Sequence, residues 1–186
     1  MASIQTLSDA DRRVLARWAA ACAERVLPLF DADAGAVREI RDAVERTRRY
    51  SRGDSSAADE IGKRMVAVKA AKAATTAAGA AAARSVAQAA AVAHMGAHAL
   101  GAAAYATKAV SLASGGRPGA VAEEIRWQLG QLSDRERAAL RLLPPLGADS
   151  SGPLCEGLLS RGILGATIRE IQVDVGSTPT LTPGVA

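Results

Sequence analysis

Aromatic side chains are scarce in this 186-residue sequence, which has two Trp, two Tyr and one Phe. Proteins that hold single-stranded nucleic acids stack bases on aromatic rings, and so few rings cannot build such a platform. The net charge of +4 is also small for a dedicated nucleic-acid-binding face. The sequence therefore argues against a nucleic-acid partner.

Cysteine is scarce too, because the chain has only Cys22 and Cys155. They lie far apart and in no CxxC arrangement, so we expect neither a disulfide framework nor a zinc ribbon, but two reduced thiols in packed helices. Residues 1–10 lack a basic stretch followed by an apolar run, which is the pattern of a secretory signal. We therefore expect a cytoplasmic protein.

Charge is absent from residues 85–107, a stretch long enough to cross a bilayer. Many of its residues are Ala, Gly, Gln and His, which gain little from contact with lipid. We therefore expect no membrane association.

Hydrophobic residues make up 49% of the chain, and nearly half of them are alanine. A core of alanines requires helix backbones to approach one another closely, so we expect an all-α bundle of about five to seven helices. Helix starts are indicated by Ser8 with Asp11, Ser56 with Asp59 and Ser133 with Glu136, since each pair can cap free backbone amides. Gly115–Gly119 and Pro144-Pro145 predict breaks.

These signals predict helices over about 8–30, 37–53, 56–75, 121–132 and 133–143, and a long central alanine-rich helix over about 81–113. In the third helix, Ile61, Met65 and Val68 are expected to face inward. The last residues predict a small tail: a short helix over 153–161, then a strand over Arg169–Val175, where apolar and polar residues alternate, turning back onto Thr180–Thr182. We expect one domain over residues 1–132 and a C-terminal extension over 133–186.

The stretch Ala91–Val110 contains both histidines of the chain. Wound as one helix, it places His94, His98, Gly101, Tyr105 and Lys108 on a single narrow stripe. His94 and His98 have the i, i+4 spacing of half a zinc site, but no third ligand stands nearby in the sequence and no glutamate lies between them. We therefore expect no metal and no other cofactor.

Without a metal, the same stripe suits proton transfer, with His94, His98 and Tyr105 as catalytic groups. Lys72 and Lys108 can then fix a small anionic ligand, and Gly101 leaves room for it. The alternative is that the histidines and the tyrosine form a structural seam of hydrogen bonds between helices. The residues alone leave both interpretations open.

The segment AHMGAHALGAAAYATKAV, residues 93–110, resembles the signature of a bacterial family of helical domains, the "immunity protein five-like" family. The first helix, LSDADRRVLARWAAACAERVLPLF, resembles the usual first helix of that family, and the segments RRYSRG and IRWQ also agree with it. The resemblance covers about residues 7–132. It implies a cytoplasmic helical protein that binds and neutralises a cognate toxin of a polymorphic toxin system. The tail departs from the family pattern. We expect it either to pack on the bundle or to pair with another subunit in a homo-oligomer.

Overall fold

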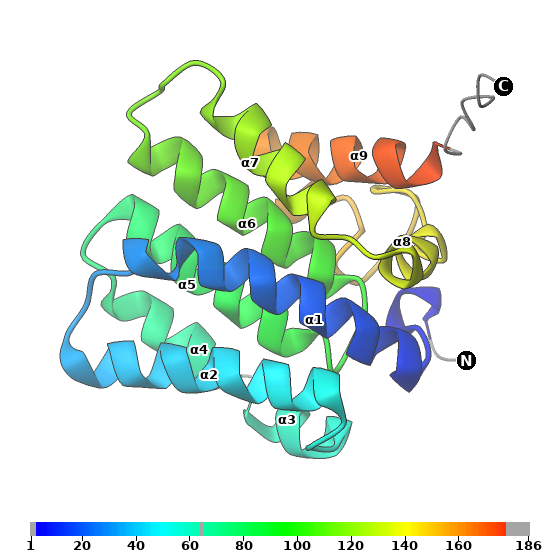
Figure 1. Cartoon of the computed structure of the whole chain (residues 1–186), viewed down its shortest axis with the longest axis horizontal. Coiled ribbons are helices and arrows are strands. Elements are labelled where there is room, and N and C mark those ends of the chain that lie inside the picture. Colours follow the sequence, from blue (N-terminus) through cyan, green and yellow to red (C-terminus); the bar gives the residue numbers. More distant parts are fainter. Residues whose placement is uncertain (1–2, 64, 178–186) are drawn as a thin grey trace, which may run out of the picture.

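The computed structural model describes residues 3–63 and 65–177, and these form an all-α bundle (Figure 1). No β-strand occurs in the described residues, so the predicted fold class is confirmed. The α-helices are α1 (Asp9–Val26), α2 (Ala34–Arg52), α3 (Ala57–Lys63), α4 (Met65–Ala70), α5 (Ala77–Ala91), α6 (His98–Ala113), α7 (Ala120–Gly130), α8 (Asp134–Arg141) and α9 (Gly162–Gly176). Short 3-10 turns are η1 (Ile4–Thr6), η2 (Leu27–Leu29), η3 (Ala71–Ala73) and η4 (Leu158–Ser160).

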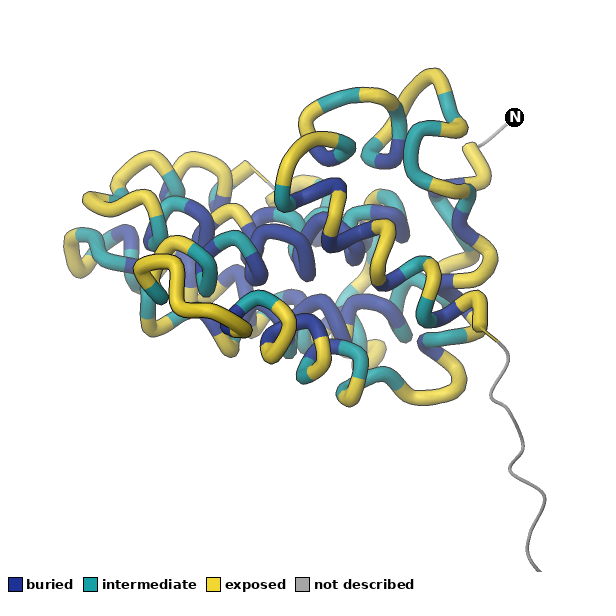
Figure 2. Tube along the Cα trace, turned by 90° about the horizontal axis from the view of Figure 1, so that it is seen from above, coloured by how far each residue is buried: buried dark blue, intermediate teal, exposed yellow. Residues whose placement is uncertain are grey.

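The alanine-rich pair α5 and α6 lies at the centre of the bundle. Helix α1 packs across both of them, and α2 and α4 pack on the side of α5. Helices α7 and α9 cover α6 (Figure 1). Seen from above, the buried parts of the chain line the inner sides of these helices, and the exposed parts lie outside (Figure 2). The side chains of α9 belong to the same hydrophobic core as those of α1 and α6, so the C-terminal extension packs on the bundle.

The predicted caps are present. The Ser8 hydroxyl accepts a hydrogen bond from the Asp11 amide at 3.1 Å, and Ser133 with Glu136 forms a reciprocal capping box. Gly53 ends α2 with φ of +90°, a backbone conformation that favours glycine. Local sequence signals therefore set these helix ends correctly.

The prediction of one long central helix is wrong, because the chain reverses direction between α5 and α6. The Gly96 amide donates to the Thr6 carbonyl and the Ala97 amide to the Gln5 carbonyl, both at 3.1 Å. A Cβ at Gly96 would lie 2.7 Å from Leu7 Cδ1, so glycine allows the turn to pack on the N-terminal segment. Contacts with residues some ninety positions away thus break a stretch whose local propensity is helical.

The predicted strand over Arg169–Val175 is also wrong, because these residues lie in α9. Leu164, Ile168, Ile171 and Val175 are buried at helical spacing, whereas Val173 is 71% exposed. The alternation of apolar and polar residues over these seven positions is therefore a coincidence within a longer pattern of helical spacing. The expected helix over 153–161 is reduced to the single turn η4, and Thr180–Thr182 lies outside the described residues.

The inward face predicted for the third helix is wrong as well. Met65 and Val68 are 50% and 39% exposed, whereas Ala67 and Ala70 are buried. Helix α4 presents its small residues to α2 and α5, because only alanines admit such close helix approach. The buried residues of the central helices α5 and α6 are likewise mostly alanine.

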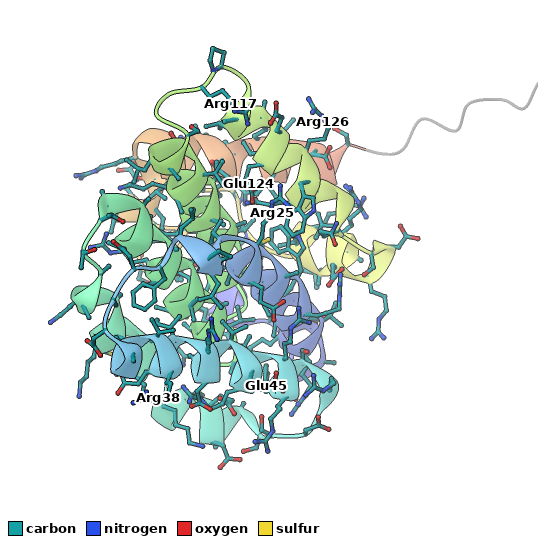
Figure 3. The ribbon with its side chains drawn as sticks, turned by 60° about the vertical axis from the view of Figure 1, so that its left-hand side comes forward. Arg25, Arg38, Glu45, Arg117, Glu124 and Arg126 are labelled. Carbon is teal, nitrogen blue, oxygen red and sulfur yellow. The ribbon has the colours of Figure 1, made fainter. Side chains whose placement is uncertain are left out.

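Buried carboxylates on α7 and α8 bind arginines from α1. Arg25 Nε lies 2.6 Å from Glu124 Oε2, and Arg17 Nε lies 2.7 Å from Glu136 Oε1. The Glu124 side chain is only 1% exposed, and Figure 3 shows Arg25 reaching toward it from α1. Trp18 is fully buried beside these pairs and donates from Nε1 to the Gln128 carbonyl at 2.9 Å. The contacts fix α1 against α7 and α8.

No helix within the described parts of the chain has both the length and the hydropathy to cross a bilayer.

We expect Arg25→Ala to destabilise the fold by about 1–3 kcal/mol, because it leaves one oxygen of a buried carboxylate without its donor. Arg25 also stacks on the Trp127 ring at 4.3 Å, and this contact is lost too. The exposed Arg126 on α7 provides the matched control, and Arg126→Ala should change the free energy of unfolding by less than about 0.5 kcal/mol. Urea denaturation of both variants measures the difference, and equal effects would contradict the assigned role of the Arg25–Glu124 pair.

Candidate functional site

Both histidines lie at the reversal between the two central helices. His94 is in the turn and is exposed, whereas His98 is the first residue of α6 and is partly buried. The expected single stripe is therefore divided, and only Gly101, Tyr105 and Lys108 keep their helical relation to His98. The N-terminal segment fixes the turn through the hydrogen bonds of Gln5 and Thr6 described above.

The fully buried side chain of Gln5 also fixes a distant loop over this turn. Gln5 Nε2 donates to Asp149 Oδ2 at 2.6 Å and to the Ser151 carbonyl at 2.8 Å, and the Leu154 amide donates to Gln5 Oε1 at 3.0 Å. Gly152 has φ of +81°, and a Cβ there would lie 2.8 Å from Gln5 Oε1. Residues 149–154 are thereby held beside the turn that carries the histidines.

A pocket of about 410 Å³ lies between this loop and the two central helices. The inner wall is formed by residues of α5, α6 and the turn between them, namely Gln88, His94, Met95, His98 and Tyr105. The outer wall is formed by Gly152, Pro153, Cys155, Gly157, Leu158 and Leu159. The structure thus brings His94, His98 and Tyr105 to one cavity, and we call it the histidine pocket.

Gln88 orients one of the histidines. Its Oε1 lies 2.8 Å from His98 Nδ1, and since a carbonyl oxygen accepts, Nδ1 carries the proton. A Cβ at Gly101 would lie 2.4 Å from the same Gln88 oxygen. The room beside Gly101 is therefore occupied by the Gln88 carboxamide, which Gly101 allows to reach His98.

Like Gln88, Tyr105 lines both the histidine pocket and a second cavity. Burial raises the pKa of its hydroxyl, and the positive charge of Arg84 lowers it by a smaller amount. The hydroxyl therefore keeps its proton at neutral pH and can donate a hydrogen bond. The second cavity has a volume of about 290 Å³, and we call it the cationic pocket; it is lined by Val68, Ala71, Lys72, Arg84, Ala87, Gln88 and Tyr105.

The predicted ligand-binding lysines lie in different places. Lys72 lines the cationic pocket, and neither histidine is among the lining residues of that pocket. Lys108 is half-buried on α6 and is among the lining residues of neither cavity. Within the described residues, no group of three or more His, Cys, Asp or Glu side chains could hold a metal ion.

The histidine pocket provides groups suited to acid–base chemistry. An imidazole can exchange a proton near neutral pH, and the protonated Tyr105 hydroxyl can stabilise negative charge on a bound molecule. The alternative interpretation, a structural seam of hydrogen bonds between helices, is also supported, because the His98–Gln88 hydrogen bond links α6 to α5. One pair of side chains thus serves both helix packing and the lining of the pocket.

Sequence reasoning missed Gln88, Arg84 and Cys155. Arg84 and Gln88 have i, i+4 spacing on α5, so they share one face, and Arg84 is the only charged residue between Lys72 and Lys108. That isolated position was a usable signal. No sequence signal pointed to Cys155, because only the loop held by Gln5 brings this residue close to the histidines.

A family model describing Imm-5 like putative immunity proteins matches residues 5–135. The chain belongs to this family. Comparisons with curated proteins and with solved structures found no match. The inner wall of the histidine pocket lies within the family match, and the outer wall, from Gly152 to Leu159, lies beyond it.

We expect the two thiols of this immunity-family protein to differ sharply in reactivity. Cys22 is fully buried, and burial raises the pKa of its thiol well above the usual value, with further contributions from Glu124 and Glu136. A thiolate-specific reagent such as DTNB at pH 8 should modify only Cys155 in the native chain and both thiols after unfolding, because the thiolate is the reactive form. Cys155→Ser should abolish native labelling, and Cys22→Ala should leave it unchanged. Native modification of Cys22 would contradict the packing of α1.

Proposed function

We propose that the chain is an immunity protein that binds and neutralises a cognate toxin in the cytoplasm. The observation that carries this proposal is the family match over residues 5–135, which includes the first helix and the whole of the central pair α5 and α6. The family description supports a toxin as the general kind of partner. That this chain binds a particular toxin is our proposal.

The charge of the protein bears on which toxins it suits. Inhibitors that imitate nucleic acid present an acidic surface to the basic active site of a nuclease. This chain has a net charge of +4, and residues 61–122 contain no Asp or Glu at all. We therefore propose a toxin that is recognised through a surface other than a nucleic-acid-binding cleft.

We expect the protein to protect cells that express the toxin encoded beside its own gene. Growth is measured with the toxin and the wild-type chain together, with the toxin alone, and with the toxin and an unrelated helical protein of equal expression. A stable complex of the two purified proteins on size-exclusion chromatography should accompany protection. Failure of both protection and complex formation would refute the toxin proposal.

The histidine pocket supports a second candidate function. We propose, as the alternative, a small-molecule-binding protein or metal-independent enzyme in which His94 and His98 exchange protons and Tyr105 donates a hydrogen bond. The observation favouring it is that all three side chains line one cavity of about 410 Å³, a size within the range of small-molecule sites. Under this candidate, Gly101 acts indirectly by allowing the Gln88 carboxamide to reach His98, Lys72 belongs to the adjacent cationic pocket, and Lys108 lies about one turn beyond Tyr105 on α6.

We expect His94→Ala and His98→Ala to separate stability from ligand binding. His94 is exposed, so its loss should change the free energy of unfolding by less than about 0.5 kcal/mol. His98→Ala removes the Gln88 hydrogen bond and should cost about 0.5–1.5 kcal/mol. Ligand-observed NMR with small carboxylates, amides and phosphate esters identifies binders of the wild type and is repeated on both variants. If the variants alter stability alone and bind every such ligand as the wild type does, the pocket serves helix packing and the second candidate fails.

A further inference from the structure

The polar residues of the cationic pocket come from three separate elements. Lys72 comes from η3, Arg84 and Gln88 from α5, and Tyr105 from α6. Because Arg84 and Gln88 stand one helical turn apart, their side chains lie on the same face of α5. Two cations and two hydrogen-bonding groups therefore converge on one cavity of about 290 Å³.

No carboxylate is among the residues that line this pocket. Elsewhere in the bundle, arginines pair closely with acidic side chains: Arg13 with Asp9 at 2.7 Å, Arg25 with Glu124 at 2.6 Å and Arg137 with Asp174 at 2.6 Å. The helices that form the cationic pocket come from residues 61–122, which contain no Asp or Glu. The positive charge of Lys72 and Arg84 is thus directed to a cavity without a matching acid in its walls.

We propose that the cationic pocket binds a small organic anion, a carboxylate or a phosphate ester, through Lys72 and Arg84. An arginine guanidinium presents paired N–H donors that match the oxygens of such groups, and a lysine amine adds a point charge. Tyr105 and Gln88 also line this cavity and add two polar side chains to its walls.

The apolar walls set the size and character of the remainder of the ligand. Val68, Ala71 and Ala87 line the pocket beside the cations, so a short hydrocarbon portion is accommodated there. A volume of about 290 Å³ lies at the lower end of small-molecule sites, which span about 300–1,000 Å³. The ligand is therefore a compact metabolite-sized anion, and its binding requires neither a toxin nor an occupied histidine pocket.

The test titrates the full chain at constant ionic strength with butyrate, with inorganic phosphate and with butyramide, the uncharged isostere of butyrate. Backbone amide NMR shifts report binding. Butyrate or phosphate should give saturable shifts at residues 71–72, 84–88 and 105, and butyramide should bind at least about ten-fold more weakly because it lacks the charge. Tighter binding of butyrate assigns a carboxylate ligand, and tighter binding of phosphate assigns a phosphate ester.

Variants of exposed residues make the assignment specific. Lys72→Gln and Arg84→Gln should each weaken binding of the better probe at least about ten-fold, since each removes a charge-assisted contact. Lys69→Gln on α4 and Arg161→Gln before α9 remove the same charges outside the pocket and should bind as the wild type does. Thermal unfolding confirms that all four variants are folded.

Three results would overturn the proposal. One is the absence of saturable shifts at the pocket with both anions. Another is equal weakening by Lys69→Gln and Lys72→Gln, which would show general attraction of anions to a basic surface. The third is butyramide binding as tightly as butyrate, which would show an apolar cavity without anion selectivity. None of these results bears on protection against a toxin, so the two proposals are tested separately.

Discussion

Close approach of the backbones of α5 and α6 is the constraint on which this structure depends. Their facing surfaces consist largely of alanine, so no large side chain separates them. The Ser85 hydroxyl crosses the interface and donates to the Ala102 carbonyl at 2.7 Å, a contact that needs helices packed at short range. Larger side chains fill the core from outside this pair, above all Trp18 and Leu15 of α1. The surrounding helices therefore supply most of the large side chains of the core.

A second consequence of the alanine centre is that polar groups hold the surrounding helices in register. Gln128 Nε2 of α7 donates to the Ala103 carbonyl of α6 and to Glu124 Oε1, and Glu124 binds Arg25 of α1. Alanine packing alone is weakly directional, because methyl groups of equal size fit one another in several registers. Hydrogen bonds between named atoms select one register, since a buried polar group is stable only where its partner stands. Helices α1, α6 and α7 are joined by this network.

The sequence predicted features whose cause is local. The caps at Ser8 and Ser133 and the end of the second helix at about residue 53 follow from residues within one or two turns, and all are present. The reversal at residues 92–97 could not be predicted in this way, because its cause is the backbone of Gln5 and Thr6. Helix α9 was missed for a related reason: seven residues with alternating polarity fit a strand, and only burial of Leu164 and Ile168 against α6 identifies the longer helical pattern. For the candidate site, the residue types at 94, 98 and 105 were sufficient to group three side chains, but the cavity also needs a loop from the far end of the chain.

That loop gives the histidine pocket two walls of different origin. The inner wall belongs to α5, α6 and their turn, where each position is constrained by the packing of the central pair. The outer wall belongs to residues 152–159, which are attached to the bundle through Gln5 and through the turn η4. A substitution at Pro153 or Leu158 can change the shape of the cavity without removing the hydrogen bond between Gln88 and His98. Because Gln88, His94, His98 and Tyr105 lie on one wall and a loop from beyond the family match forms the other, the loop can vary in sequence while α5 and α6 retain their packing.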